Sequence, residues 1–525
     1  MHHAHRAFGV LAGLAIVAAP AVAGGTLTLI GYIDLVDRLG GPENVPTGAD
    51  VVVGQVEAPS GGAYGPNQGS DEFTGKTFTA HSGAPGSSGH ATTVATAMYG
   101  NNNSAAPGVS DIHLWEASNW VFGGFLNYSS PLTVGPDAPP PGLRIFNNSW
   151  VGSLGSNAND NIVLRRADVA AASSDLLMIV GVNNSGTSPA LLFAQYNGIA
   201  VGRDNGAHAS NDTPGGLDGP GRMKPELVAP GSATSFSTPV VSACAALLID
   251  TARTDPGLAR NPFAERSETI KAVLMAGAEH RAGWTNNPQT SGPQRGVTAR
   301  PLDNVYGADL VNIDRSHLIL TAGEQDASST PPPAPTIAER GWDYASVAIG
   351  ASAYYRFRIV EPADDVSILA TWHRNVRLSS NQSVPGNFDL TLWRVGPGEV
   401  LESLVGDAGL DDFGGGNVVS QSALDNVEHL HLTDLMPGDY VIEVDRLDAT
   451  GIYPQWDVAV AWIMPDQPDA VPGDLDGDGT VGPADLAQLL GAWGACDGCP
   501  EDLDGDGTVG PADLAILLGH WGAGG

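Results

Sequence analysis

The sequence has few cysteines, few basic residues and no long apolar run after its first residues. Its 525 residues include three cysteines, too few for a disulfide-rich scaffold. Lys and Arg number 24 against 58 Asp and Glu, and the resulting net charge of −34 repels nucleic-acid phosphates. After residue 23 no stretch approaches the roughly 20 apolar residues that a membrane helix needs. We therefore expect no nucleic-acid partner and no membrane span in the mature chain.

The first residues are typical of an export signal. A weakly basic start with three histidines and Arg6 precedes the apolar run Phe8–Ala19 and an Ala-Val-Ala sequence before Gly24. We predict a signal peptide over residues 1–23 and a secreted, extracellular or cell-surface location. The remaining chain is too long for one hydrophobic core, so several domains are expected.

Residues 24–323 alternate between short β-rich apolar runs and helical stretches. The expected strands include 50–56, 143–146, 176–182 and 199–201, and the expected helices include 90–98, 162–173 and 238–250. Strands separated by helices predict βαβ units and a mainly parallel α/β sheet domain.

The second half of the chain changes character. A Pro-, Ser- and Ala-rich segment, 324–336, is a predicted linker. Residues 337–464 contain alternating runs such as 354–359 and 440–444, punctuated by Gly, Pro and Asp, which predict an antiparallel β-sandwich. A second predicted linker, 465–472, precedes a distinct final segment, 473–525.

One Ser-rich turn has the pattern of a nucleophile. The sequence ATSFSTP places Ser235 just before an apolar helical run, with Pro239 in the expected first turn. A nucleophilic Ser needs an exposed turn near backbone N–H groups that bind an oxyanion, and a helix dipole favours negative charge there. The alternative is a turn that only caps the helix.

Three other segments precede this turn in a fixed order: SSGHATTVATAMYG, RIFNNSWVG and LLMIVGVNNSG. Together with ATSFSTP they resemble the subtilisin-like serine peptidases, the subtilase family, between residues 47 and 320. The resemblance implies that Ser235 is the nucleophile, His90 the general base and Asn184 the oxyanion donor, with Asn183 as the alternative donor.

The resemblance also implies where a protein or peptide substrate binds. RIFNNSWVG is similar to the strand that lines the family's substrate cleft, where the peptide pairs with the backbone as an added strand. Ser149 and Gly152 would then lie near its path.

The third triad member departs from the family. The family's first strand ends in Asp, whereas DVVVGQVEAPSGG ends its strand in Glu57, whose carboxylate accepts an imidazole N–H as Asp does. Asp71 or Glu72 from a loop is the alternative acid. Ala91 and Ala233 also replace family glycines, so a second hypothesis is an impaired pseudopeptidase that serves adhesion or assembly. An esterase is disfavoured, since no G-x-S-x-G elbow surrounds the serine.

The last segment contains an acidic repeat. DLDGDGTVGPADLAQLLGAWG, from residue 474, recurs from residue 502 with two of 21 positions changed. Calcium prefers six to eight oxygen ligands on a compact loop. Oxygen-bearing residues at loop positions 1, 3, 5, 7 and 12 are the predicted ligands of two Ca²⁺ ions: Asp474, Asp476, Asp478, Thr480 and Asp485, then Asp502, Asp504, Asp506, Thr508 and Asp513.

Each repeat is a loop followed by an apolar helical run, half of an EF-hand. The pair resembles a type I dockerin domain, which implies a small all-α domain and a cohesin-like or cell-surface partner. Within it, Cys496 and Cys499 are predicted to form a small disulfide. The sequence as a whole thus predicts a secreted serine endopeptidase with a subtilisin-like sheet domain, a β-sandwich and a calcium-binding tail.

Overall fold

The computed structural model describes residues 23–209, 211–334, 336–448, 453–467, 472–475, 480–496 and 499–522. Residues 1–22 of the predicted signal peptide lie outside the described residues, as do two of the predicted calcium ligands, Asp476 and Asp478.

A parallel sheet forms the centre of the first half of the chain. Its strands are β1 Val52–Glu57, β2 Thr77–Ala80, β3 Asp111–Glu116, β4 Leu143–Asn148, β5 Leu177–Gly181, β6 Gly198–Arg203 and β9 Leu227–Ala229. Within the described ranges the order is β2-β3-β1-β4-β5-β6-β9, and every neighbouring pair is parallel. Val- and Ile-rich runs suit this position because helices cover both faces of a parallel sheet. The predicted parallel α/β domain is confirmed.

Eight helices belong to this unit among the described residues: α1 Ala23–Leu29, α2 Tyr32–Arg38, α3 Gly89–Tyr99, α4 Ala117–Asn119, α5 Asn157–Ser174, α6 Thr234–Thr254, α7 Ser267–Ala276 and α8 Ile313–Thr321. Of the described helices, α6 alone is long and apolar enough to cross a membrane. It packs instead against α3 and strands β4, β5 and β6, and most of it is buried. We conclude that α6 is the core helix of this domain.

Two sheets follow, and they are antiparallel apart from one parallel strand pair in the first of them. One contains β12 Ser352–Ile359, β16 Phe388–Gly396, β17 Val400–Ser403, β19 Val419–Ser420 and β21 Gly438–Arg446, and also β10 Val297–Thr298 from the first unit. The other contains β11 Arg340–Ala348, β13 Val366–Thr371, β18 Phe413–Gly416, β20 Val427–Leu435 and β22 Gln455–Ile463. An apolar core that includes Phe357, Ile442 and Val460 lies between the two sheets. We call this unit the sandwich.

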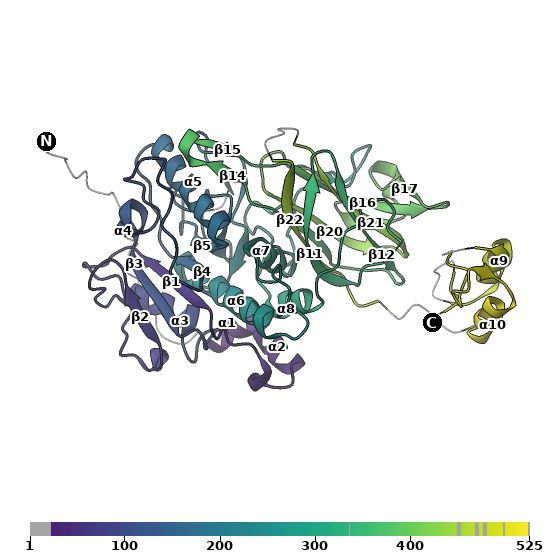
Figure 1. The fold of residues 1–525 in the computed structure, drawn as a ribbon, viewed down its shortest axis with the longest axis horizontal. Coiled ribbons are helices and arrows are strands. Elements are labelled where there is room, and N and C mark those ends of the chain that lie inside the picture. Colours follow the sequence, from purple (N-terminus) through teal and green to yellow (C-terminus); the bar gives the residue numbers. More distant parts are fainter. Residues whose placement is uncertain are drawn as a thin grey trace.

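The sandwich packs directly on the parallel-sheet unit. Helices α7 and α8 lie against β11, β13 and β22, where the two units meet (Figure 1). Trp342, Leu369 and Ala459 of the sandwich belong to the same apolar cluster as the core of α6. The segment predicted as the first linker packs along the sandwich. Its Gln325 N–H donates to the Trp342 carbonyl at 2.8 Å, and its Ser328 forms an isolated β-bridge with Tyr354.

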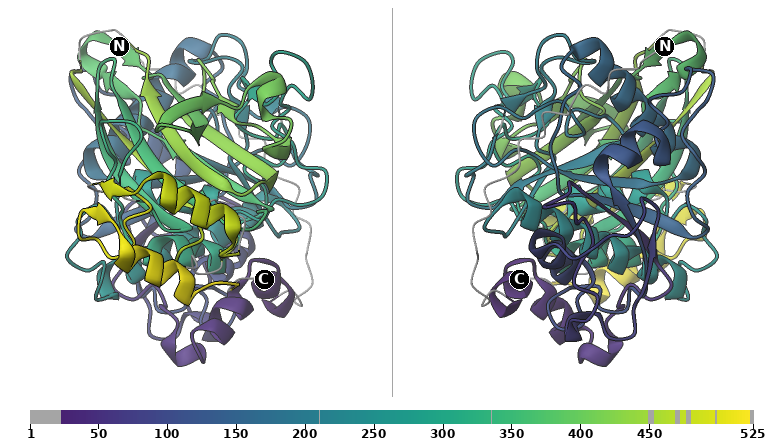
Figure 2. Two further views of the ribbon diagram at one scale, coloured as in Figure 1. Left: turned by 90° about the vertical axis from the view of Figure 1, so that its right-hand side faces the viewer. Right: turned by 90° about the vertical axis from the view of Figure 1, so that its left-hand side faces the viewer.

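The described residues of the tail form two helices and one short strand pair. Helices α9 Pro483–Gly491 and α10 Pro511–Gly519 lie side by side (Figure 2), and β23 Gly494–Ala495 pairs with β24 Thr508–Val509. Cys496 and Cys499 are joined by a disulfide, as predicted. The described part of the tail is therefore mixed in secondary structure, whereas an all-α domain was predicted.

The remaining short elements are η1 Pro42–Asn44, η2 Asp71–Phe73, η3 Trp120–Gly124, η4 Leu378–Ser380, η5 Gly406–Gly409, β7 Asn211–Asp212, β8 Met223–Lys224, β14 Asn375–Arg377 and β15 Gln382–Val384.

Candidate active site

The end of β1 and the start of α3 bring a carboxylate to an imidazole. Glu57 is the last residue of β1, at the carboxyl edge of the parallel sheet. His90 lies in the first turn of α3, which begins after Ser88, whose hydroxyl accepts the Ala91 N–H. Oε2 of Glu57 lies 2.8 Å from Nδ1 of His90. The two residues are 33 apart in the chain and form a hydrogen-bonded pair, in which Glu57 is buried and His90 is partly exposed.

A chain of side chains fixes the Glu57 carboxylate. Its other oxygen, Oε1, accepts the Gln55 amide at 2.9 Å, and the same amide nitrogen lies 3.0 Å from the Ala91 carbonyl. The Tyr99 hydroxyl donates to Oε1, the side-chain amide oxygen of Gln55. Glu57 itself is 1% exposed. Sequence reasoning missed Gln55 and Tyr99, although the i, i+2 spacing of Gln55 and Glu57 places both on one side of the strand.

The carboxylate sets the charge state and orientation of the imidazole. Burial lowers the pKa of His90, but the hydrogen bond and charge of Glu57 outweigh burial and raise this pKa above its ordinary value of 6.5. In the neutral ring, Nδ1 carries the proton toward Glu57, so Nε2 is left as the acceptor. This tautomer is the one that a general base needs.

Neither alternative acid contacts His90 in the described part of the chain. The Glu72 carboxylate, in η2, accepts the backbone N–H of Asn102 at 3.1 Å and the amide group of Asn103. Asp71 accepts the Asn101 amide through its backbone carbonyl at 3.3 Å. Among the described residues Glu57 is the carboxylate that contacts His90.

The start of α6 places Phe236, the residue after Ser235, beside His90. Ser235 is the second residue of α6 and is half-buried, and the ring of Phe236 lies 5.5 Å from the ring of His90. Pro239 lies inside the helix rather than in its first turn. Because proline has no N–H, the Ser235 carbonyl loses its helical partner, and the Ser149 hydroxyl donates to it at 2.9 Å.

The side chain of Asn184 is tied to the same helix start. Its Oδ1 accepts the backbone N–H of Thr234 at 2.8 Å. The Thr234 hydroxyl lies 3.2 Å from the same oxygen, but it donates to the closer Val182 carbonyl at 2.6 Å. With the oxygen held there, the exposed amide group presents its N–H bonds near the turn that carries Ser235. Asn183 differs, since its amide donates to the carbonyls of Ser185 and Thr187 within its own loop. The geometry therefore favours Asn184 over Asn183 as the donor.

The two residues predicted to lie along the substrate path have partners inside the chain. Ser149 is 3% exposed and donates to Ser235. Gly152 donates to the Leu191 carbonyl at 3.3 Å and accepts the Leu191 N–H at 2.9 Å. Contact of either residue with a substrate stays a prediction, and at Gly152 an added strand would have to compete with Leu191.

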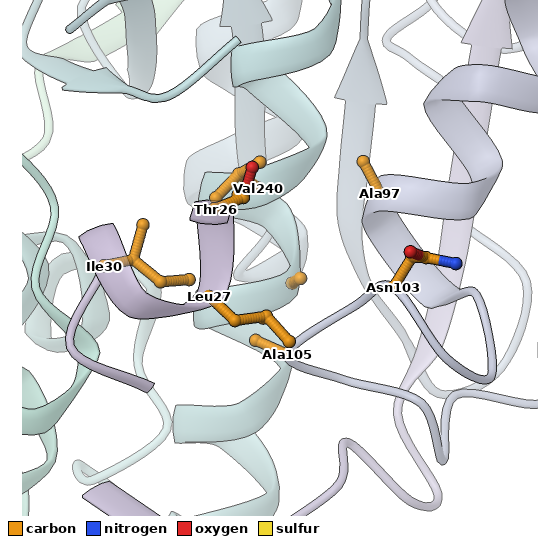
Figure 3. Close-up of a pocket in the computed structure, with 8 residues that line it drawn as sticks. Thr26, Leu27, Ile30, Ala97, Asn103, Ala105 and Val240 are labelled. Atoms are coloured by element: carbon orange, nitrogen blue, oxygen red, sulfur yellow. The ribbon is translucent and has the colours of Figure 1, made fainter. Parts of the chain in front are cut away.

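Small hollows among the described residues include the following two. One is mostly apolar and contains none of the predicted site residues; it is formed by α1, α3, α6 and the loop after α3 (Figure 3). The other is lined by Thr187 and Ser188, which follow Asn184, and by Phe193, Asp212 and Lys224. This second hollow therefore adjoins the loop that follows Asn184.

Residues 63–300 match the subtilase family. The subtilase segment includes His90, Asn184 and Ser235, and Glu57 lies just before its first residue. This match and the parallel sheet assign the coarse class, a subtilase-type serine peptidase fold. A search of curated proteins found no match.

Solved structures similar to the chain include three proteases. A prenylagaramide maturation protease has 19% identity and a TM-score of 0.35, covering 55% of this chain and 98% of its own. A cold-adapted subtilisin-like serine proteinase has 20% identity and a TM-score of 0.29, covering 45% and 84%. A protease from Pseudoalteromonas arctica PAMC 21717 has 14% identity and a TM-score of 0.35, covering 54% and 95%.

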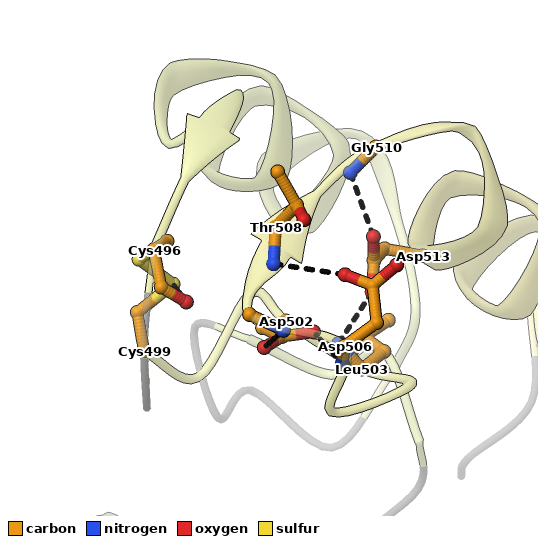
Figure 4. The surroundings of a disulfide bond; sticks show 9 residues. Cys496, Cys499, Asp502, Leu503, Asp506, Thr508, Gly510 and Asp513 are labelled. Atoms are coloured by element: carbon orange, nitrogen blue, oxygen red, sulfur yellow. Dashed lines mark hydrogen bonds between the residues drawn. A yellow bond between two sulfur atoms is a disulfide. The ribbon is translucent and has the colours of Figure 1, made fainter.

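The second acidic loop of the tail gathers its carboxylates. Oxygens of Asp502, Asp504 and Asp506 lie within 4.8 Å of one another. Asp513, 1% exposed, accepts the N–H of Leu503 and that of Gly510, both at 2.7 Å (Figure 4). The position-12 carboxylate thus closes the loop from its start to the start of α10. Hard oxygen ligands on one short loop fit a calcium ion.

The first loop is closed in the same way. Asp485, also 1% exposed, accepts the N–H of Leu475 and that of Gly482, both at 2.6 Å. Asp474 and Thr480, the predicted ligands at positions 1 and 7, lie in the described part of this loop.

Proposed function

We propose that this protein is a secreted serine endopeptidase in which Glu57, His90 and Ser235 form the catalytic triad. The observation that supports this most strongly is the 2.8 Å contact of Glu57 Oε2 with His90 Nδ1, next to the helix start that carries Ser235. The order acid, His, Asn, Ser along the chain is that of the subtilase resemblance.

The reaction follows from these positions. Ser235 Oγ attacks the carbonyl carbon of the scissile peptide bond while His90 Nε2 takes the hydroxyl proton. The developing oxyanion accepts hydrogen bonds from the Asn184 amide and the Ser235 N–H. His90 then gives its proton to the leaving amine, and the acyl-enzyme is hydrolysed by a water that His90 activates. Glu57 stabilises the imidazolium without taking its proton.

A fluorophosphonate probe tests this assignment directly. The probe forms a covalent bond with an activated serine, so the calcium-loaded full chain should be labelled at Ser235, and Ser235→Ala should not. Ser237→Ala is the matched control, because Ser237 is buried two residues further along the same helix. Absence of labelling in the folded chain would support the pseudopeptidase hypothesis instead, with Ala91 and Ala233 as the residues to examine.

For the tail we propose two calcium sites and a protein-binding face. Leu490 and Trp493 of the first repeat are equivalent to Leu518 and Trp521 of the second, 28 residues later. Each of these four side chains is exposed, by 51%, 47%, 50% and 44% respectively. Large exposed apolar groups in a repeated pattern are typical of an interaction surface. This supports attachment to a cohesin-like or cell-surface protein, with each repeat offering the same contact.

Export is proposed from the N-terminal sequence. Cleavage after Ala23 would begin the mature protein at Gly24, and N-terminal sequencing of the protein recovered from the medium of expressing cells tests this.

A further inference from the structure

Three metal-ligating side chains from two structural units meet at one point. His280 follows α7 of the parallel-sheet unit, Asp365 directly precedes β13, and His431 lies in β20 of the sandwich. His280 Nδ1 and His431 Nε2 each lie 3.2 Å from Asp365 Oδ1. The two imidazole rings are stacked, with centroids 4.0 Å apart. One ligand atom from each residue therefore falls within 4.8 Å of the other two.

These separations suit a tetrahedral ion. Metal–nitrogen and metal–oxygen bonds of about 2.0–2.1 Å place neighbouring ligand atoms roughly 3.3 Å apart. The observed separations of 3.2 Å are close to this edge length. Two imidazole nitrogens and one carboxylate oxygen form a ligand set that Zn²⁺ accepts readily, whereas Ca²⁺ prefers oxygen ligands alone.

The surroundings orient the ligands and leave access from solvent. Arg315 donates to the second oxygen of Asp365 at 2.8 Å, which fixes the carboxylate as an outer partner does in many metal sites. The Trp284 ring packs edge-on against His280 at 4.5 Å. The His280 side chain is 3% exposed, and its Nε2 has no hydrogen-bond partner in the part of the chain that the structure describes. Asp365 is 38% exposed, so an ion can reach the cluster.

We propose that His280, Asp365 and His431 bind one divalent transition-metal ion of the Zn²⁺ class. The ion would hold the loop after α7 to the sandwich, with water completing its coordination. The competing interpretation is a cluster held by hydrogen bonds alone, in which both imidazoles donate to Asp365. The two interpretations differ in a measurable property, the affinity of this cluster for metal.

Calorimetric titration of the full chain with Zn²⁺, in saturating Ca²⁺, separates them. Calcium fills the tail loops, so their carboxylates compete less for Zn²⁺. We expect one tight Zn²⁺ site per chain, and His431→Gln should weaken it at least about 100-fold, since loss of an outer partner alone costs 10- to 100-fold. Gln keeps the size of the side chain and is a poor ligand. X-ray absorption of the Zn²⁺-loaded chain should show two imidazole ligands.

The matched control is His113→Gln. His113 also lies beside a second histidine, His81, with ring nitrogens 2.7 Å apart, so it reports adventitious binding by paired histidines. Both variants keep the histidines at positions 2, 3 and 5. Equal Zn²⁺ affinity in the unaltered chain and His431→Gln would overturn the proposal. If His431→Gln fails to fold, Asp365→Asn at the more exposed position gives the same comparison.

Discussion

The buried carboxylate of Glu57 accepts hydrogen bonds from two residues, Gln55 and His90. These two bonds explain how a Glu, one methylene longer than Asp, is accommodated at this position. Gln55 holds one oxygen and the Ala91 carbonyl at the same time, so β1 and α3 are fixed relative to each other. The other oxygen then reaches His90 at an ordinary hydrogen-bond distance of 2.8 Å.

Replacement of the acid should therefore cost activity rather than stability. Glu57→Gln keeps the shape but removes the charge that fixes the His90 tautomer, and we expect kcat to fall by about 10³- to 10⁴-fold. Glu57→Asp retains the charge but shortens the side chain by one methylene, so a smaller loss is expected. Kinetics on a peptide substrate measure both. A Glu57→Gln variant with unchanged kcat would show that another group orients His90.

The raised pKa of His90 predicts the acidic limb of the activity profile. The general base must be neutral, so kcat/KM should fall as the pH drops through an apparent pKa above 6.5. In Glu57→Gln burial remains while the charge is lost, so this limb should move to lower pH. The pH dependence of kcat/KM in the two proteins tests the shift.

The same shift has a stability consequence of opposite sign. Because the folded-state pKa of His90 is raised, protonated His90 stabilises the fold below its ordinary pKa, and this contribution is lost as the pH rises through the raised value.

Asn184 provides the third test at this scale. Asn184→Ala should lower kcat by about 10²- to 10³-fold, or roughly 3–4 kcal/mol of transition-state stabilisation, with little change in KM. Thr234→Val is informative beside it, since it keeps the backbone N–H that holds Asn184 Oδ1 and removes only the hydroxyl 3.2 Å away, so a smaller loss is expected. An unchanged kcat in Asn184→Ala would exclude this amide as the oxyanion donor.

At the scale of elements, strands and helices with strong apolar patterns were predictable, and their ends were less so. β1, β4, β5 and β6 lie where Val- and Ile-rich runs placed them. Helix α6 was expected from residue 238 because proline usually begins a helix, yet it starts at Thr234. The Ser149 hydroxyl, just after the end of β4, donates to the Ser235 carbonyl in place of the N–H that Pro239 lacks. Such compensation by a distant side chain is not visible in a local pattern.

A buried ion pair joins α5 to the hairpin of β14 and β15. Arg374, on the loop into β14, is fully buried, bonds Asp168 of α5 and donates to Asp218 at 2.8 Å. Arg374→Met would leave Asp168 without this partner, and we expect a loss of about 3–5 kcal/mol of folding free energy. The urea midpoint of unfolding measures it. Arg377→Met, at an exposed position of β14, is the control and should change the midpoint little.

For the whole molecule, the tail should respond to calcium separately from catalysis. Chelation should loosen loops whose carboxylates repel one another, as the raised pKa of Asp504, caused by desolvation and by neighbouring Asp residues, indicates. We expect faster proteolytic cleavage after residue 472 and unchanged hydrolysis of a short peptide substrate. Asp502→Asn with Asp504→Asn should reproduce the effect in the second loop. Cleavage that does not depend on Ca²⁺ would contradict calcium binding by the tail.

The sequence indicated the order of the units but not how the first two join. Composition marked residues 324–336 as a linker, because Pro and Ser are frequent there. Apolar residues of α7, α8 and the sandwich make the contacts that join the two units. In the sequence these residues cannot be told from residues that pack inside a single unit. The cluster of His280, Asp365 and His431 was likewise invisible, since its members are spread over 151 positions of the chain.

The pairing of β10 with β19 and the contact of α7 with β22 have a consequence for biosynthesis. A chain that emerges from its N-terminus presents Ser235 more than 200 positions before the strand that ends at Ile463. Until that strand arrives, the face of α7 that packs against β22 is uncovered, although α6 and α8 already cover other parts of the helix. The parallel-sheet unit can therefore complete its packing only after the sandwich has been translated, when most of the polypeptide has been made.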